Sequence, residues 1–326
     1  MRLVPSLVIA LCFAPIAIAQ PAPAPVPASG VATVPRAERV VIISVDGLRP
    51  DLLIRGDVPN IRGLLKAGSY TFWARTVPEA YTLPSHASML TGVSPQKHGV
   101  TWNDHIEQAY PESSTLFEVA KQAGLTTALA SGKTKFVVFD KPGTLDWKYL
   151  PRDEPILDTF VARQAERMVR EHKPQVLFVH LAGVDAVGHL RGWGSPEQLA
   201  WLGEADKSVG IVLAAVNEAG LTDSTLLILT ADHGGAGVEH GPNDERSALV
   251  PWIAVGPGVR KGMDLTRYPD LKVNLVDTFA TACAALGIKL KVAVEGKPVT
   301  QISEQSPAPS LVPQATETTP ATPAKR

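Results

Sequence analysis

The chain has 326 residues, a formal net charge of -1 and 45% hydrophobic residues. This apolar content is enough for a sizeable core, and the length fits one large domain or two small ones. The near-neutral charge, with no basic stripe and no acidic tail, gives no basis for binding duplex nucleic acid.

Residues 1–19 are typical of an export signal. Arg2 supplies a positive charge, and residues 7–19 are almost wholly apolar but too short to span a membrane. Small residues at Ala17 and Ala19 favour cleavage before Gln20. This interpretation predicts an exported protein, periplasmic or secreted, whose mature chain has no transmembrane span; the alternative is an uncleaved membrane anchor.

Two segments rich in Pro and Ala flank the predicted folded domain. Residues 20–36 are typical of an extended linker and residues 303–326 of a disordered tail. The folded domain is therefore predicted to span residues 37–302. Removal of the signal leaves one cysteine, Cys283, which excludes an intrachain disulfide, and its apolar helical surroundings predict an inert core residue.

Within this domain, apolar runs alternate with helical patterns. The predicted strands are residues 39–45, 126–130, 175–180, 225–230 and 250–255. The predicted helices are residues 59–68, 115–124, 158–172, 196–220 and 274–287, with a further helix start at 85–90. The alternation predicts a three-layer α/β/α fold with a mostly parallel central sheet. In such folds, ligands bind beyond the carboxyl ends of the strands.

The first predicted strand leads directly into Asp46. A carboxylate that follows an all-apolar strand is costly unless it is paired or binds a metal. The alternative interpretation is an aspartate that caps a helix through residues 48–53.

The strand at 225–230 leads to Asp232 and His233, followed by Gly234 and Gly235. Aspartate offers a hard oxygen and histidine a borderline nitrogen, the mixture that zinc accepts. The glycines allow a sharp backbone turn and leave room around an ion. An Asp-His pair for general base catalysis is the alternative.

A third set of candidate ligands follows the strand at 175–180. Asp185 and His189 are four residues apart, which places them on one face of a helix or one side of a turn. A surface ion pair is the alternative, against which the apolar neighbours argue. His240 is the only histidine after His233, so a further histidine ligand from that side must be His240. Together these residues are the right inventory for two adjacent metals.

The loop that precedes the helix start at residue 85 offers the nucleophile. A helix N-terminus presents free N–H groups and a positive dipole end to a phosphate. Thr82 is expected before the helix, where its oxygen can ligate a metal and lose its proton. Ser85 is the second hydroxyl candidate or a helix cap. His86 is either a base or a core residue.

Four segments that contain these residues resemble the alkaline phosphatase superfamily, and within it the bacterial type I phosphodiesterase / nucleotide pyrophosphatase branch. They are VVIISVDGLRPD, YTLPSHASMLTGVSPQKHGVTWN, HLAGVDAVGH and LTADHGGAGVEHGP, in the family's order from residue 40 to residue 242. The resemblance implies an alkaline-phosphatase-like domain without a large cap insertion. It also implies a hydrolase that cleaves small-molecule phosphate esters, with phosphodiester or nucleotide pyrophosphate bonds as the expected substrates.

The resemblance further implies two divalent metal ions, zinc first, with manganese or iron as alternatives. The first metal is assigned Asp46, Thr82, Asp232 and His233, and the second Asp185, His189 and His240. Thr82 would attack phosphorus and form a phosphothreonine. Asn103 would donate a hydrogen bond to a phosphoryl oxygen, a neutral donor aimed at charge that builds in the transition state.

The sequence departs from the family at two points. Ala236 stands where the family often has histidine, and His240 follows without the insertion found in larger members. No arginine matches the clamp of the alkaline phosphatases, which favours diesters, because a monoester dianion needs more cationic neutralisation.

Three residues near the motifs are left outside the site. Lys133 is expected in an exposed turn, with contact to a substrate phosphate as the alternative. Asp206 is either a partner of a metal-bound histidine or a surface acid, and Trp102 either stacks on the substrate or packs in the core.

Other functions fit parts of this pattern. The nearest is a phosphomonoesterase or phosphotransferase on the same scaffold. A non-catalytic envelope protein that binds metals structurally would need neither Thr82 nor Asn103. A metal-independent hydrolase would use Ser85 and His86.

Overall fold

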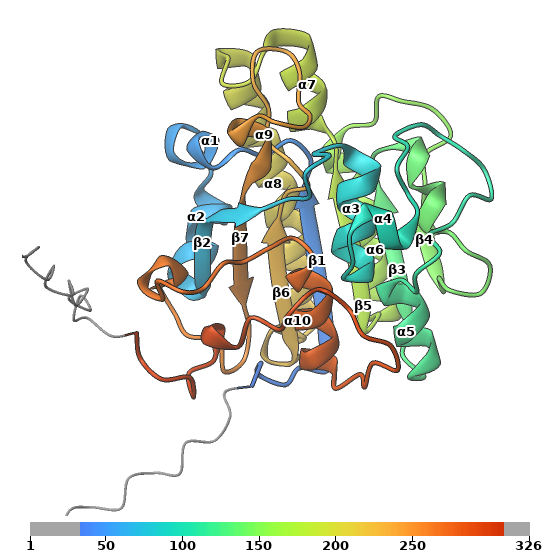
Figure 1. The fold of residues 1–326 in the computed structure, drawn as a ribbon, viewed down its shortest axis with the longest axis vertical. Helices are drawn as coiled ribbons and strands as arrows, with labels where there is room; N and C mark the ends of the chain where they lie inside the picture. Colours follow the sequence, from blue (N-terminus) through green and yellow to red (C-terminus); the bar gives the residue numbers. More distant parts are fainter. Residues whose placement is uncertain (1–32, 310–326) are drawn as a thin grey trace, which may run out of the picture. The chain divides into compact units, whose positions relative to one another are not determined.

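The apolar, β-branched segments form the centre of an eight-stranded sheet in the computed structural model, which describes residues 33–309 (Figure 1). The strand order is β4-β3-β5-β1-β6-β7-β2-β8. The strands are β1 (Arg39–Val45), β2 (Ser69–Arg75), β3 (Thr127–Ser131), β4 (Trp147–Tyr149), β5 (Val176–Leu181), β6 (Thr225–Thr230), β7 (Leu249–Val255) and β8 (Met263–Asp264). β1 pairs in parallel with β5 and β6, whereas β7 runs antiparallel to β6 and β2. The sheet is therefore mixed and mostly parallel, as predicted.

Helices cover both faces of this sheet, which completes the predicted α/β/α fold. In Figure 1, α10 (Asp277–Leu286) lies in front of the sheet and α8 (Pro196–Glu218) behind it. α3 (Thr82–Thr91) packs on α10, and α6 (Asp158–His172) packs on α8. The remaining helices are α1 (Pro50–Arg55), α2 (Pro59–Ala67), α4 (Pro95–His98), α5 (Leu116–Gln122), α7 (Gly183–Arg191) and α9 (Glu245–Ala248). Four 3₁₀ turns span Thr134–Phe139, Thr222–Ser224, Leu265–Arg267 and Thr300–Ile302.

The strongest sequence patterns predicted their elements closely. The predicted bounds coincide with those of β1, β6 and α6. Continuous apolar runs form the two strands because both of their faces are covered by helices, and all six residues of β6 are buried.

The start of α3 differs from the prediction. The helix begins at Thr82 and not at Ser85, with Tyr81 as its N-cap residue. Pro84 falls in the first turn, where N–H groups have no acceptor within the helix, so its missing N–H group costs no hydrogen bond. Thr82 therefore lies in the helix N-terminus itself and not in the loop before it.

The sequence analysis did not identify β2, β4 or β8. β2 alternates between buried and more exposed residues along most of its length, and β4 and β8 have only three and two residues. Short or half-exposed strands near a sheet edge lack the continuous apolar run that marks β1 and β6.

The two ends of the domain extend beyond the predicted bounds. Ser303 and Ser306, assigned to a tail, are buried, and Arg260 donates to the carbonyl of Ser306 at 2.6 Å. At the other end, Arg36 donates to the carbonyls of Ala284 and Leu286. The predicted export signal, most of the linker and the rest of the tail lie outside the described residues. Within residues 33–309, no helix combines the length and apolarity needed to cross a bilayer.

Candidate active site

The carboxyl ends of β5, β1 and β6 meet at one edge of the sheet and position three aspartates. Asp46 directly follows β1, and Asp232 lies two residues after β6. Asp185 lies in the first turn of α7, which follows β5. The relative exposures of Asp46, Asp185 and Asp232 are 0%, 3% and 0%. Burial deprives carboxylates of hydration, so three of them together need a compensating cation.

Gly47 allows the turn that follows Asp46 to lie close to Asp185. Its φ is +73°, and a Cβ atom there would lie 2.9 Å from Cα of Asp185. The Gly47 amide donates to Oδ1 of Asp232 at 3.1 Å, and its carbonyl accepts from the indole of Trp193 at 2.9 Å. The turn after β1 is therefore tied to the segments that carry the other two aspartates.

A hairpin after β6 returns His240 to His233. Ala236 and Glu239 exchange two backbone hydrogen bonds of 2.8 and 3.1 Å, which close a tight turn. The imidazoles of His233 and His240 stack with their centroids 3.6 Å apart. The short hairpin thus brings the late histidine to the cluster without an insertion, and Ala236 belongs to the turn.

The three candidate histidine ligands share one hydrogen-bonding arrangement. In each, Nδ1 lies against a backbone carbonyl: His189 on Val238 at 2.8 Å, His233 on Gly234 at 2.9 Å and His240 on Ala80 at 2.8 Å. A ring whose Nδ1 donates to a carbonyl keeps Nε2 as its lone-pair nitrogen. Each imidazole is thereby oriented as a metal ligand before any metal binds.

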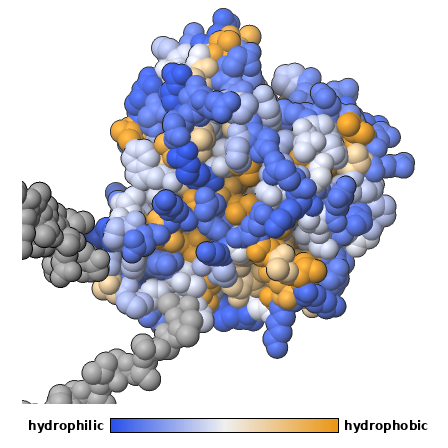
Figure 2. Space-filling view, in the orientation of Figure 1, coloured by the Kyte–Doolittle hydropathy of each residue, from blue (hydrophilic) through white to orange (hydrophobic). Residues whose placement is uncertain are grey.

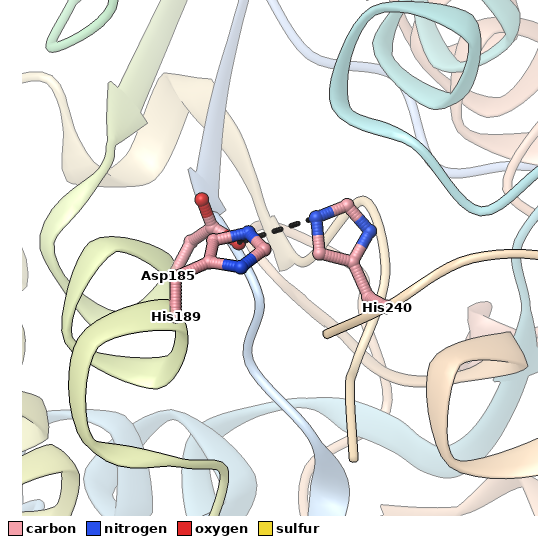
Figure 3. A group of neighbouring side chains, drawn as sticks. All are labelled: Asp185, His189 and His240. Atoms are coloured by element: carbon pink, nitrogen blue, oxygen red, sulfur yellow. Dashed lines mark ion pairs between the residues drawn. The ribbon is translucent and has the colours of Figure 1, made fainter. Parts of the chain in front are cut away.

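Two groups of these side chains have the spacing of metal sites. One comprises Asp185, His189 and His240, and the other Asp46, Asp185 and His233, with ligand atoms within 4.8 Å of one another in each group. Figure 3 shows the first group, with Asp185 and His189 on α7 facing His240 on its loop. It coincides with the set predicted for the second metal. In the other group Asp185 replaces Asp232, whose Oδ2 lies 3.1 Å from Nε2 of His233.

Unpaired polar atoms point to what this cluster holds. Among residues 33–309, four of its buried atoms have no hydrogen-bond partner. They are Oδ1 of Asp46, Oδ1 of Asp185, Oδ2 of Asp232 and Nε2 of His233. Buried polar atoms are nearly always satisfied, and these four are all lone-pair donors suited to a cation. The residues present therefore fit divalent metal ions.

Lys133 lies inside this cluster, so its assignment to an exposed turn was wrong. The loop after β3 turns inward, and the Lys133 side chain is 10% exposed. Its Nζ lies 2.7 Å from Oδ2 of Asp46, 2.6 Å from Oδ2 of Asp185 and 3.3 Å from Oγ1 of Thr82. A short polar GKTK stretch resembles a surface turn in the sequence because the carboxylates that attract it lie far away along the chain.

Thr82 and Asn103 meet at the N-terminus of α3. Oδ1 of Asn103 accepts from the amide of Leu83 at 3.0 Å and from Nζ of Lys135 at 3.0 Å. Because both hydrogen bonds are accepted by Oδ1, they orient the side-chain amide and leave its Nδ2 group available as a donor. Thr82 is buried, and its Oγ1 faces the Lys133 ammonium. The structure therefore brings all eight predicted site residues to one sheet edge.

His180 is a site residue that the sequence analysis missed. It is the fifth residue of β5, and its Nε2 lies 2.8 Å from Oδ2 of Asp46. Its ring stacks on Phe136 with centroids 4.1 Å apart. Only the parallel register, which pairs His180 with Ser44, reveals this contact.

The residues with alternative roles have structural partners. Nε2 of His86 lies 2.8 Å from Oγ of Ser44 and its Nδ1 2.8 Å from the carbonyl of Thr82, while Oγ of Ser85 accepts from Thr76. His86 thus fills the core and forms no dyad with Ser85. Asp206 accepts from the amides of Asn60 and Ile61, so it caps the start of α2.

Burial and interactions between neighbouring charges shift the pKa values of the side chains in this cluster. Burial raises the pKa of Asp46, but Lys133 and His180 outweigh this and hold it well below its usual range. Burial and the neighbouring Asp46 raise the pKa of Asp232 well above its usual range. Burial and the nearby His240 lower the pKa of His233 to about 3, which leaves a neutral imidazole. One lysine therefore does not neutralise three carboxylates, and further cations are favoured.

A separate cavity of about 590 Å³ lies beside α5 and α10. Apolar side chains line part of it, including Phe279, Ile288 and Leu290. In the view of Figure 2, apolar residues gather in the lower middle of this face among polar ones. The cavity includes none of the candidate site residues, so charge and unpaired atoms identify the site better than cavity volume does.

An α/β/α fold with aspartate and histidine gathered at the sheet edge beside a threonine at a helix start defines a protein of the alkaline phosphatase superfamily. Within it, the chain belongs to the type I phosphodiesterase / nucleotide pyrophosphatase family, whose sequence model matches residues 40–255.

Curated relatives are distant and longer. The catalytic subunit of GPI ethanolamine phosphate transferase 2 from Homo sapiens is 26% identical over 287 residues, which cover 82% of this chain and 29% of that protein. Ectonucleotide pyrophosphatase/phosphodiesterase family member 5 from Homo sapiens is 23% identical over 61% of this chain and 45% of its own length. The chain thus spans less than half the length of these relatives.

Solved structures share the fold. An inactive threonine-to-alanine variant of murine ectonucleotide pyrophosphatase/phosphodiesterase 5, in complex with AMP, has a TM-score of 0.68 at 15% identity and covers 81% of this chain and 99% of that one. A phosphonate monoester hydrolase from Agrobacterium radiobacter has a TM-score of 0.65 at 16% identity and covers 84% of this chain and 78% of that one.

Proposed function

We propose that this protein hydrolyses phosphate esters with two zinc ions and Thr82 as nucleophile, and that phosphodiester or nucleotide pyrophosphate bonds are its substrates. One observation carries the proposal: unpaired buried carboxylate oxygens and an imidazole nitrogen converge beside a hydroxyl at a helix N-terminus. A purely structural metal site needs neither the hydroxyl nor the oriented Asn103 amide.

Asp46, Thr82, Asp232 and His233 would hold one metal, and Asp185, His189 and His240 the other. When bound, the metals supply Lewis acidity to the phosphoryl oxygens and lower the pKa of bound water. Mixed oxygen and nitrogen ligands suit zinc, and they also accept manganese or iron.

Residues of the chain bind and orient the reacting group. Oγ1 of Thr82 gives up its proton to solvent and attacks phosphorus while the bond to the leaving oxygen breaks; that oxygen departs with the electron pair and takes up a proton from solvent. The Asn103 amide donates to a non-bridging oxygen as negative charge builds there. Water then cleaves the bond between phosphorus and Oγ1, which releases phosphate or a phosphomonoester and restores the hydroxyl.

The family and one structural neighbour support the proposed hydrolysis of phosphate esters. The family is named for phosphodiesterase and nucleotide pyrophosphatase activity, and one structural neighbour binds AMP. The inactive variant of that neighbour has a threonine replaced by alanine, which fits a threonine nucleophile on this fold.

The test measures kcat/KM for bis-p-nitrophenyl phosphate and p-nitrophenyl phosphate on zinc-loaded protein, before and after dialysis against a chelator. We expect turnover that is lost on chelation and returns with zinc. Turnover that survives metal removal would overturn the metal assignment, and no turnover of either ester would favour the non-catalytic alternative.

A further inference from the structure

The two predicted metal sets are held by different parts of the fold. Three ligands of the first set, Asp46, Asp232 and His233, follow β1 and β6 and are fully buried. The histidines of the second set lie further out. His189 is in α7, with a side chain that is 39% exposed, and His240 ends the hairpin that begins at His233. Strand pairing positions the first set directly, whereas the second set depends on how α7 and the hairpin meet.

Trp193 joins these two segments. It lies in the turn after α7, and its amide donates to the carbonyl of Gly237, in the turn of the hairpin, at 2.7 Å. A Cβ atom at Gly188 of α7 would lie 2.9 Å from Cδ2 and Cε2 of the indole. A Cβ atom at Gly235 of the hairpin would lie 2.4 and 2.3 Å from the same two atoms. The ring therefore packs directly on the backbone of both segments, at positions where a side chain would exclude it.

The same indole faces both histidines of the second set. Its centroid lies 5.1 Å from that of His189 and 5.8 Å from that of His240, and the two imidazoles lie 4.9 Å apart. The indole meets each imidazole edge to face, a favourable geometry for aromatic pairs. Trp193 thus restrains both rings, in addition to the carbonyls of Val238 and Ala80 that lie against their Nδ1 atoms.

A third contact connects the indole to the sheet. Its Nε1–H group donates to the carbonyl of Gly47 at 2.9 Å, in the turn that follows Asp46. Trp193 is 8% exposed, so this hydrogen bond is shielded from water. One side chain therefore ties the segments that carry His189 and His240 to the sheet edge that carries Asp46.

We infer that Trp193 is a positioning residue for the second metal, because it holds α7 and the hairpin at the separation at which Asp185, His189 and His240 bind one ion. This role rests on the proposed function, and it makes the second metal the one whose affinity depends on a side chain outside the ligand set. The first metal, whose ligands follow paired strands, depends on Trp193 much less. Residues that orient metal ligands typically contribute 10- to 100-fold to metal affinity.

Calorimetric titration of the metal-free protein with zinc tests this role in Trp193→Phe and Trp193→Leu. Phenylalanine keeps an aromatic ring but loses the N–H donor, and leucine loses the ring as well. We expect zinc affinity at the second site to fall about tenfold in Trp193→Phe and about 100-fold in Trp193→Leu, while affinity at the first site stays within about threefold of wild type. His240→Ala, which lacks a ligand of the second set, identifies the binding step that belongs to this site.

Trp252→Phe is the matched control. The indole of Trp252 is fully buried in β7 and donates to Oγ1 of Thr278 at 3.0 Å, so the substitution removes the same group and the same kind of hydrogen bond. We expect it to lower the free energy of unfolding and to leave both zinc affinities unchanged. Urea unfolding of the metal-free proteins shows that each variant is folded and separates lost stability from lost metal affinity.

Excess zinc provides a second readout. A residue that only positions the second metal is dispensable once that metal is bound. Raising the zinc concentration should therefore restore kcat of Trp193→Phe for bis-p-nitrophenyl phosphate to within about threefold of wild type, with half-maximal activity at about tenfold more zinc.

Different outcomes contradict different statements. Zinc affinities of the Trp193 variants that equal those of wild type, or that fall equally at both sites, would overturn the role of Trp193 and leave the proposed function intact. A loss of kcat in Trp193→Phe that saturating zinc does not restore would also overturn this role. Wild type that binds two zinc ions but cleaves neither p-nitrophenyl ester would overturn the proposed function, while the titrations would still test Trp193.

Discussion

Nε2 of His180 lies 2.8 Å from Oδ2 of Asp46, across the parallel pair of β5 and β1. On its other side, Nδ1 of His180 lies 3.2 Å from Oγ of Ser131 in β3. Three adjacent strands thus orient one carboxylate. Because Oδ2 is engaged by His180 and Lys133, Oδ1 is directed to His233 and the proposed metal.

Replacing His180 should weaken metal binding in a protein that remains folded. Outer hydrogen bonds to a ligand typically contribute 10- to 100-fold to metal affinity, so we expect zinc affinity to fall within about that range in His180→Gln. Competition with a chromophoric chelator measures this. His98→Gln is the matched control, since His98 is equally buried but contacts Ser88 and Val100. Equal affinities in all three proteins would mean that His180 does not tune the metal.

The contrast between His180 and Asp46 shows what sequence reasoning can and cannot reach. Asp46, Asp185 and Asp232 follow strands or begin the next helix, and a parallel sheet gathers such positions at one edge. His180 lies within an apolar strand, and Lys133 lies in a polar loop, so neither carries a local signal. Their roles depend on strand order, which periodicity does not determine.

The same limit applies to the fold, in which the sequence pattern predicted strands but not every strand direction or helix start. Continuous runs such as residues 39–45 predicted central strands because burial on both faces requires an apolar side chain at every position. The antiparallel β7 has an apolar run of the same kind, so its direction was not predictable from its sequence. The start of α3 was placed at residue 85, three residues late, although Pro84 is tolerated in the first helical turn.

Thr82 provides the sharpest test of the nucleophile. Thr82→Ala should lower kcat about 10³-fold or more while the remaining aspartates and histidines retain the metals, because it removes the attacking oxygen. Thr82→Ser restores that oxygen and should recover much of the rate. Pre-steady-state trapping of a phosphorylated hydroxyl in wild type, and its loss in Thr82→Ala, is the accompanying measurement. Near-wild-type turnover of Thr82→Ala would remove Thr82 from the mechanism.

Gly47 links the fold to the site, and its substitution should damage both. A Cβ atom would meet the backbone of Asp185 at 2.9 Å, and the φ of +73° disfavours any residue with a side chain. We expect Gly47→Ala to lower the free energy of unfolding by about 1–3 kcal/mol and to reduce metal content. Urea unfolding and elemental analysis measure the two effects. Gly63→Ala is the control, since a Cβ atom there meets nothing within 4 Å.

Asp158, at the start of α6, predicts a pH-dependent stability. Burial raises the pKa of this carboxyl to about 6, although the amide of Gly183 donates to its Oδ1 at 3.0 Å. An acid with a raised pKa binds its proton more tightly in the folded state. It therefore destabilises the fold progressively as pH rises from about 4, the ordinary aspartate pKa, to about 6, and the destabilisation stays constant above that.

Asp158→Asn removes the ionisation and should stabilise the protein by up to about 3 kcal/mol at pH 8, with little gain at pH 4. Urea unfolding of metal-free wild type and variant across this range gives the difference at each pH. Asp57→Asn is the control, because this carboxyl is exposed and should leave the curve unchanged. A gain that is the same at pH 4 and pH 8 would show that the variant acts through packing and not through the buried charge.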